Sequence, residues 1–242
     1  MALGRSAVVG PAPELLRVEG LAWPVELRVH PRARRLRLAI DDRRERLRLT
    51  CPPRLSRRAA LKWAGEQRGW VDRQIGQREA PIRLVPGAVI PFDGGERRLE
   101  WVEGATRTVG LTDETIACGG PLDGYERRIG RWLKAEALRR LSEETADIAS
   151  RAGIRVAAVA VGDAGTRWGS CSADGRIRFN WRLLLAPPEV RRYVVAHEVA
   201  HRRHMDHGAA FHAFEAELFG GSTDRARRKL RRLSALLRRV RL

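Results

Sequence analysis

Apolar and polar residues alternate along three stretches near the start of the chain, which read VELRVHP, RRLRLAI and ERLRLT. Within each stretch the apolar residues fall two apart with mostly charged residues between them, and this is the period of a half-buried β-strand. Asp41 and Asp42 separate the second stretch from the third and predict a turn. The pattern therefore predicts a meander of three strands.

A helical period replaces this alternation between residues 56 and 77. Ser56 is a suitable N-cap, because its hydroxyl can accept a hydrogen bond from the first free backbone amides. The apolar residues that fall at roughly helical spacing are Ala60, Leu61, Ala64, Val71 and Ile75. Between residues 82 and 117 the chain returns to short strands, which Pro-Gly and Gly-Gly pairs interrupt.

The second half of the chain predicts a long helix, a hairpin and a further helix. Asp123 and Glu126 resemble a capping box and predict a helix that runs to about residue 152. A strand, IRVAAVAV, follows, and then a hairpin, TRWGSCSADGRIRFNWRLLL, with the two-residue turn Asp174-Gly175. Proline is well placed at a first helical turn, so the next helix is expected to begin at Pro187-Pro188 and to include PEVRRYVVAHEVAHRRH.

These elements predict four segments. Residues 1–20 form a flexible leader, residues 21–118 a β-rich region with one helix, residues 119–224 a mixed core, and residues 225–242 a basic amphipathic helix. A basic amphipathic helix can bind an anionic membrane or a partner. We favour the interpretation that its leucine stripe packs on the domain and its arginines face water, because a core-facing helix has the same pattern.

The composition is that of a globular protein. Of the 242 residues 43% are hydrophobic, and no run of about 18 apolar residues that could span a membrane occurs. The first apolar stretch is too short for a secretory signal. Cys51, Cys118 and Cys171 are an odd number at unrelated spacings, so they predict neither a disulfide framework nor a cysteine-rich zinc site. We therefore expect a reduced, cytoplasmic protein.

The formal net charge is +18, with 47 Lys and Arg residues against 29 Asp and Glu residues. Nearly all of the basic residues are arginines. Such a charge attracts polyanions without sequence information. Because the arginines are spread along the whole chain, the charge alone is a weak argument for a nucleic-acid partner, which stays an alternative to a peptide or protein substrate.

Five of the six histidines lie in one stretch of 19 residues, VVAHEVAHRRHMDHGAAFH. This stretch contains an HExxH motif within the predicted helix. Residues four apart lie one turn above each other, so His197 and His201 project from one face and can bind one divalent cation. Glu198 follows the first of these ligands and can take a proton from a metal-activated water.

A catalytic zinc ion needs a third protein ligand and an open position. His204 lies on the same helical face, but three ligands along one straight helix span about 10 Å and cannot close on one ion. His207 is favoured, because Gly208 beside it allows the chain to turn back. The other candidates further along the chain are His212, Glu215 and Glu217. The spacing of the histidines matches the metzincin motif, but His204 replaces its glycine and no methionine follows that could form a Met-turn.

The stretch from residue 166 to residue 212 resembles the YgjP-like metal-dependent hydrolases, small zincins related to the SprT-like proteins. The residues that carry this resemblance are RWGSCS, the FNWRL strand, the YVVxHExxH helix and the closing DHGxxF. Residues 25–80 are also similar in pattern to the family's N-terminal strands and helix. One departure is His212, where the family commonly has tryptophan.

The resemblance implies an α+β fold whose zincin-like metallopeptidase core spans residues 119–224, with an active-site helix packed against a small sheet. It also implies a zinc site with His197, His201 and His207 as ligands and Glu198 as the general base. The natural substrates of the family are poorly defined, so the resemblance does not name the bond that is cleaved.

The RWGSCS stretch has two compatible interpretations. It can simply be half of a hairpin, with Trp168 in the core. It can also bind a peptide as an added strand, with Trp168, Gly169 and Ser170 in contact with the substrate. Gly169 would then allow another backbone to come close. A nucleophilic role for Cys171 is disfavoured, because a lone cysteine is usually a small buried residue.

The sequence thus predicts a zinc-dependent hydrolase, and in the first place a metallopeptidase in which Glu198 activates a water molecule. Two alternatives stay open. One keeps zinc but hydrolyses nucleotides or other phosphoryl compounds, which nearby arginines would favour. The other is a non-catalytic nucleic-acid-binding protein in which the histidines hold a structural metal ion.

Overall fold

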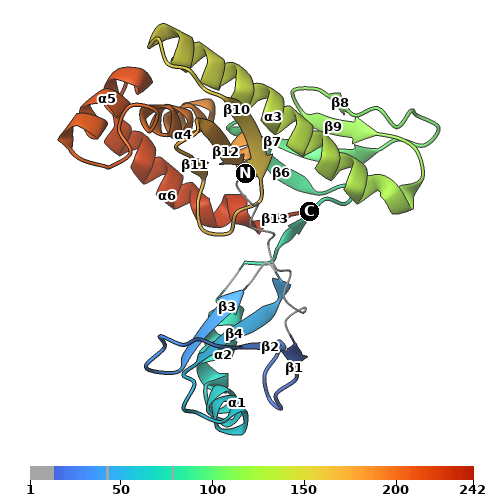
Figure 1. Cartoon of the computed structure of the whole chain (residues 1–242). Coiled ribbons are helices and arrows are strands. Elements are labelled where there is room, and N and C mark those ends of the chain that lie inside the picture. The colour runs from blue at the N-terminus through green and yellow to red at the C-terminus, as the bar shows by residue number, and fades with distance from the viewer. Residues whose placement is uncertain (1–13, 42–43, 78) are drawn as a thin grey trace, which may run out of the picture. The chain divides into compact units, whose positions relative to one another are not determined.

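The protein has an α+β fold, as the sequence predicts, and divides into two compact units (Figure 1). The computed structural model describes residues 14–41, 44–77 and 79–242. The units are Met1–Glu79 and Ala80–Leu242. None of the helices in the described part of the chain combines the length and the apolar character needed to cross a membrane.

The boundary between the units differs from the predicted one, which lies at residue 118. The strands between residues 82 and 118 belong to the second unit, because their apolar side chains share one core with its long helix. The buried residues from these strands and the adjoining loop are Leu84, Ile90, Phe92, Leu99, Ile116 and Cys118. An alternating pattern identifies a strand but not the layer that covers it, so the sequence does not reveal this partner.

The first unit contains a four-stranded sheet in the order β1-β2-β4-β3. The strands are β1 (Leu15–Leu16), β2 (Val25–Val29), β3 (Arg37–Asp41) and β4 (Arg46–Cys51). The predicted meander is wrong, because β2 pairs in parallel with β4, and of the three predicted strands only β3 and β4 are antiparallel neighbours. β4 takes the central place because Leu47, Leu49 and Cys51 are all fully buried. Of the expected leader, residues 1–13 lie outside the described residues, and β1 lies within the rest of it.

Two helices, α1 (Arg57–Glu66) and α2 (Arg68–Gly76), stand where the sequence predicts one. Ser56 caps α1, since its side chain accepts a hydrogen bond from the amide of Ala59 at 3.2 Å. The break falls at Gln67, whose ψ angle of 8° leaves the helical range. Gly65 and Gly69 flank this break, and glycine is a weak helix former.

The second unit begins with a four-stranded sheet in the order β6-β7-β9-β8. These strands are β6 (Val89–Phe92), β7 (Gly95–Trp101), β8 (Gly110–Leu111) and β9 (Thr115–Cys118). Asp93 and Gly94 connect β6 to β7 with φ angles of 53° and 88°, as a tight hairpin turn requires. Ahead of this sheet, β5 (Ile82–Arg83) pairs in parallel with β13 (Val240–Arg241), the last strand of the chain.

The long helix α3 (Tyr125–Arg151) lies along this sheet and continues to the next one (Figure 1). Its buried face includes Ile129, Leu133, Ala137, Leu141 and Ile148. The predicted capping box is not formed, because a 3-10 turn, Leu122–Gly124, precedes the helix and its N-cap is Gly124. Glu126 instead accepts a hydrogen bond from Arg83 at 3.3 Å.

A three-stranded sheet with the order β10-β12-β11 follows α3. It contains β10 (Ala158–Gly162), β11 (Gly169–Cys171) and β12 (Arg176–Asn180). β11 and β12 form the predicted antiparallel hairpin, and Gly175 in its turn has a φ angle of 88°. Because β12 pairs on its other side with β10, β11 is left as the edge strand.

The remaining chain forms three helices that pack around this sheet. After a 3-10 turn, Trp181–Leu185, come α4 (Pro188–Ala200), α5 (Ala209–Phe219) and α6 (Thr223–Arg239). Helix α4 contacts α3, α5, α6 and β11, and most of its residues are buried. The basic helix α6 buries Leu230 and Leu237, so its leucine stripe packs on the unit.

Candidate metal centre

The HExxH residues lie at the end of α4. Pro188 stands in the first turn, where its missing amide costs nothing, and the helix ends at Ala200 with His201 as its C-cap. The imidazole rings of His197 and His201 lie one turn apart, with 5.0 Å between their centroids. Both rings are partly exposed, whereas the residues around them on the helix are mostly buried.

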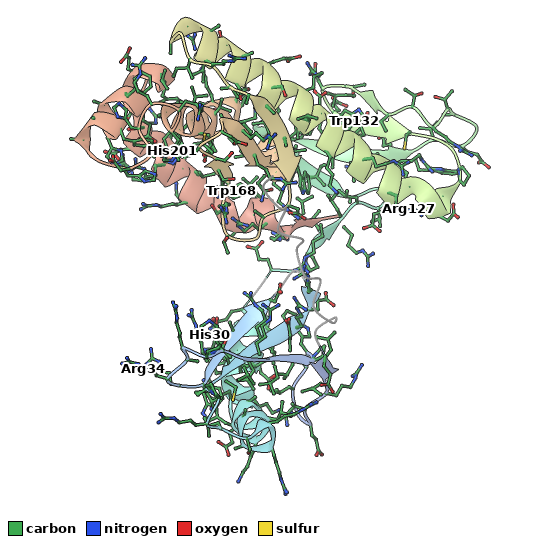
Figure 2. The ribbon with its side chains drawn as sticks, viewed as in Figure 1. His30, Arg34, Arg127, Trp132, Trp168 and His201 are labelled. Carbon is green, nitrogen blue, oxygen red and sulfur yellow. The ribbon has the colours of Figure 1, made fainter. Side chains whose placement is uncertain are left out.

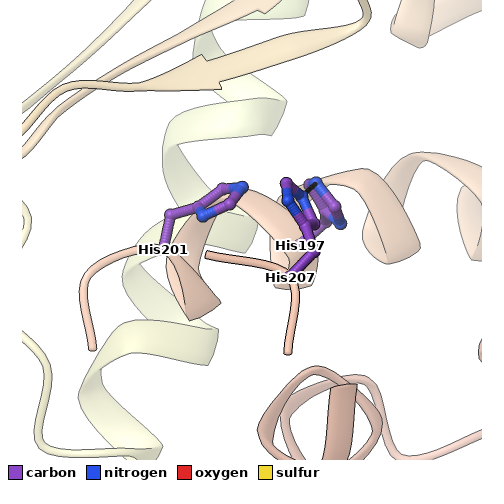
Figure 3. Close-up of side chains that lie close together, drawn as sticks. All are labelled: His197, His201 and His207. Atoms are coloured by element: carbon purple, nitrogen blue, oxygen red, sulfur yellow. Dashed lines mark hydrogen bonds between the residues drawn. The ribbon is translucent and has the colours of Figure 1, made fainter. Parts of the chain in front are cut away.

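The chain turns back after α4 and brings a third imidazole to this pair. Ligand nitrogens of His197, His201 and His207 all lie within 4.8 Å of one another. Figure 3 shows their rings converging from the helix and from the returning segment. Phe211, which is fully buried on α5, contacts all three rings at centroid distances of 4.6–5.1 Å. It forms an apolar floor that keeps the three rings together.

The spacing of the His197 and His207 nitrogens fits two ligands of one tetrahedral metal ion. Two histidine ligands of zinc, each about 2.0–2.1 Å from the ion, lie about 3.3–3.4 Å apart. The Nε2 atoms of His197 and His207 are 3.4 Å apart. The ligand nitrogen of His201 lies within 4.8 Å of both, so the three imidazoles could hold one ion together.

A carboxylate holds His197 from the side opposite to its Nε2 atom. Glu215 on α5 is fully buried, and its Oε1 atom lies 2.7 Å from Nδ1 of His197. Its Oε2 atom lies 3.2 Å from Nδ1 of His212 and 3.4 Å from a guanidinium nitrogen of Arg227. Burial opposes the ionisation of Glu215, but hydrogen bonds from the two histidines outweigh it and lower its pKa to about 2.

His201 is oriented by the backbone. Its Nδ1 atom lies 3.1 Å from the carbonyl oxygen of His204 and donates to it, so Nε2 is the nitrogen free to bind a metal ion. Burial lowers the pKa of His201, which favours the neutral ring that a metal ion needs. The side chain of His204 points elsewhere and contacts the ring of Phe214.

Glu198 is nearly buried, with 4% of its surface exposed. Its Oε2 atom is buried and has no hydrogen-bond partner in the described part of the chain. Burial raises the pKa of Glu198 to about 7, although the charges of His197 and Arg167 oppose this shift. A carboxyl group in such surroundings can both accept and return a proton near neutral pH.

Gly169 on β11 lies directly against Glu198. A Cβ atom at this position would lie 2.3 Å from Oε1 and 2.6 Å from Cγ of Glu198, closer than atoms can approach. The close approach that Gly169 permits is therefore to a side chain of this same unit. The edge strand and the HExxH helix can meet only because this residue has no side chain.

A cavity of about 240 Å³ opens beside these residues. Trp168 and Gly169 from the expected substrate strand line it together with His197 and Glu198, whereas Ser170 does not. Tyr193 and Leu230 also line this cavity, although neither was expected at the site from the sequence. Tyr193 stands four residues before His197, a spacing that places it on the same helical face. Leu230 comes from α6, and no local signal could have indicated it.

The family model for the YgjP-like metallopeptidase domain matches residues 34–233. The chain belongs to this family. A YgjP-like protein is a metal-dependent hydrolase, so the metal cofactor and the peptidase class follow from the match.

No curated protein matches the chain. Among solved structures, the crystal structure of the metallopeptidase zymogen of Pyrococcus abyssi abylysin is similar at 20% identity. The match covers 42% of this chain and 99% of that chain, with a TM-score of 0.36.

The carboxylate of Glu215 yields a prediction about metal binding in this YgjP-like protein. Glu215→Gln should weaken zinc binding by about ten- to a hundredfold, because the ring of His197 loses the charged group that orients it. Zinc affinity is measured by competition with a coloured chelator. Glu217→Gln, which removes the same charge from an exposed position of α5, is the matched control. Equal zinc affinities of the two variants would show that Glu215 does not support the metal site.

Proposed function

We propose that this protein is a zinc-dependent peptidase in which His197, His201 and His207 hold the ion and Glu198 is the general base. The donor set supports zinc, because three neutral imidazoles and one open position are typical of catalytic zinc sites. When bound, zinc would acidify a water molecule and polarise the carbonyl of the scissile bond.

The observation that carries the proposal is the position of Glu198. Its carboxylate is buried close to His197, unpartnered at Oε2 among the described residues, and has a pKa raised to about 7 by burial. Glu198 accepts a proton from the attacking water and returns it to the leaving amine. A histidine cluster with a purely structural role would not need an unpaired carboxylate at this place, which argues against the non-catalytic alternative.

The proposed substrate is an extended peptide. The edge strand β11 offers unpaired backbone groups on the side away from β12, and a peptide can pair there as an added strand. Trp168, Gly169 and Ser170 are the residues that would contact it. Since Gly169 lies against Glu198, a peptide on this edge would pass close to the proposed general base.

We also propose a cytoplasmic location. Support comes from the three cysteines, which are all free thiols. Cys51 and Cys118 are buried, and burial raises the pKa of Cys171, so none of these positions favours a reactive thiolate.

Metal content is the first test of the proposed ligands. The wild-type protein, purified without a histidine tag, should hold about one zinc ion per chain by mass spectrometry. His207→Ala should lose most of this zinc, because two imidazoles on one helix leave the ion without its third protein ligand. His204→Ala, which removes a neighbouring imidazole but keeps the carbonyl that orients His201, should retain it. A His207→Ala protein with full zinc would contradict the assignment.

The role of Glu198 is tested by its amide. Glu198→Gln should keep zinc but lower the hydrolysis of a fluorogenic peptide mixture by at least about a hundredfold, since the amide cannot accept the proton. Glu189→Gln, at the start of the same helix, is the matched control and should retain wild-type turnover. Normal turnover of Glu198→Gln would exclude this residue as the base.

The contact between Gly169 and Glu198 yields a separate prediction. Gly169→Ala should lower turnover by at least about tenfold without loss of zinc, because the new Cβ atom must displace the carboxylate, and small displacements of a catalytic group are costly. Gly76→Ala adds a methyl group where no atom lies within 4 Å and serves as the control. Unchanged turnover of Gly169→Ala would mean that the strand yields and the carboxylate stays in place.

A further inference from the structure

A second cavity, which we call the arginine cavity, lies beside β11 and has a volume of about 470 Å³. Its lining includes Gly162, Ser170, Arg178 and Asn180. It shares Arg167, Trp168 and Gly169 with the cavity at the metal centre. The same short segment therefore borders both cavities.

The pairing of the hairpin assigns the two cavities to opposite faces of the sheet. In an antiparallel ladder, paired residues point to the same face and successive residues to opposite faces. Gly169 pairs with the buried Phe179, on the face that carries Glu198. Ser170 pairs with the exposed Arg178, on the other face.

Two guanidinium groups in the arginine cavity form no ion pair within the part of the chain that the structure describes. Neither Arg167 nor Arg178 forms a hydrogen bond or an ion pair with another described residue. The one acidic residue of the lining, Asp163, is already in an ion pair with the buried Arg182. Apart from the electrostatic interaction of Arg167 with Glu198, the described residues leave the positive charge of the lining uncompensated.

Arg178 also has a defined position. A Cβ atom at Gly162 would lie 2.9 Å from its Nε atom, so the guanidinium lies close against this glycine on β10. Trp168, labelled in Figure 2, is covered by the guanidinium of Arg238 at 4.6 Å from its ring centroid. Arg238 also donates to the carbonyl oxygen of Gly165 at 2.6 Å, and these contacts fix the loop that forms the wall of the cavity.

We propose that the arginine cavity binds an acidic side chain of the peptide substrate, next to the residue that lies over the metal centre. The inference rests on the proposed function. A peptide that pairs with β11 places successive side chains on opposite faces. One side chain then faces Glu198, and its neighbour lies over Ser170, within reach of Arg167 and Arg178. A carboxylate matches the planar donors of two arginines, so the protein would prefer Asp or Glu beside the scissile bond.

The test measures binding and does not depend on turnover. Labelled ten-residue peptides of alternating Thr and Glu, or of alternating Thr and Gln, are titrated against the full-length, zinc-loaded Glu198→Gln protein and followed by fluorescence anisotropy. Because Thr and Glu alternate, all Glu side chains of a bound peptide lie on the same face of its strand, whichever register the peptide adopts on β11. The Glu peptide should bind at least about tenfold more tightly than the Gln peptide, the size expected for hydrogen bonds to charged groups.

The matched variants separate the arginine cavity from general charge and from zinc. Arg178→Gln should remove most of the preference for Glu. Arg176→Gln, which removes the same charge from the same face of β12 outside the cavity, should retain it. Gly162→Ala, which displaces the Arg178 guanidinium without changing the charge, should reduce it. If the preference for Glu came from carboxylates that bind zinc directly, all three variants would show the same preference.

Three outcomes would overturn the inference. The first is equal affinity for both peptides in the parent protein. The second is an equal loss of preference in Arg176→Gln and Arg178→Gln. The third is tight, Arg178-dependent binding of ATP with no preference for the Glu peptide, which would assign the cavity to phosphate groups. None of these results bears on zinc content or on the turnover loss of Glu198→Gln, so the proposed function is tested independently.

Discussion

The second unit depends on one buried ion, the carboxylate of Glu215. Removing a charge from water costs several kcal/mol unless charged or polar partners replace the lost hydration. The partners are His197 from α4, His212 from α5 and Arg227 from α6. A single carboxylate thus joins the three helices that follow the hairpin, and any shift of one helix would leave it unsatisfied. The orientation of the first HExxH histidine follows from this constraint.

Two buried glutamates close to the same imidazole acquire opposite properties. Glu215 is surrounded by donors and its pKa falls to about 2, whereas Glu198 lies against the backbone of Gly169 and its pKa rises to about 7. The difference comes from hydrogen bonding, since both carboxylates lose contact with water. One carboxylate is suited to hold a ring in place and the other to exchange a proton, which are two tasks in the proposed zinc-dependent mechanism.

The edge strand β11 connects these properties to the proposed peptide substrate. Gly169 faces Glu198 and Ser170 faces the arginine cavity, so one short strand borders both the proposed reaction centre and the proposed specificity site. The pleat makes this arrangement unavoidable, because successive residues of a strand, and of any peptide paired with it, alternate between the faces. In the proposed complex, the residue over the metal centre and the residue that is selected are therefore neighbours in the peptide.

Local patterns in the sequence determined the HExxH helix and the Asp174-Gly175 hairpin around the centre, and the cap at Ser56 in the first unit. They depend on periods and turn residues within a few positions, which a single chain displays directly. Tertiary structure alone decided the parallel pairing of β2 with β4, the boundary at residue 79 and the position of Glu215 behind His197. These features depend on which surfaces bury each other, and a strand or a carboxylate has the same local pattern whatever distant partner it finds.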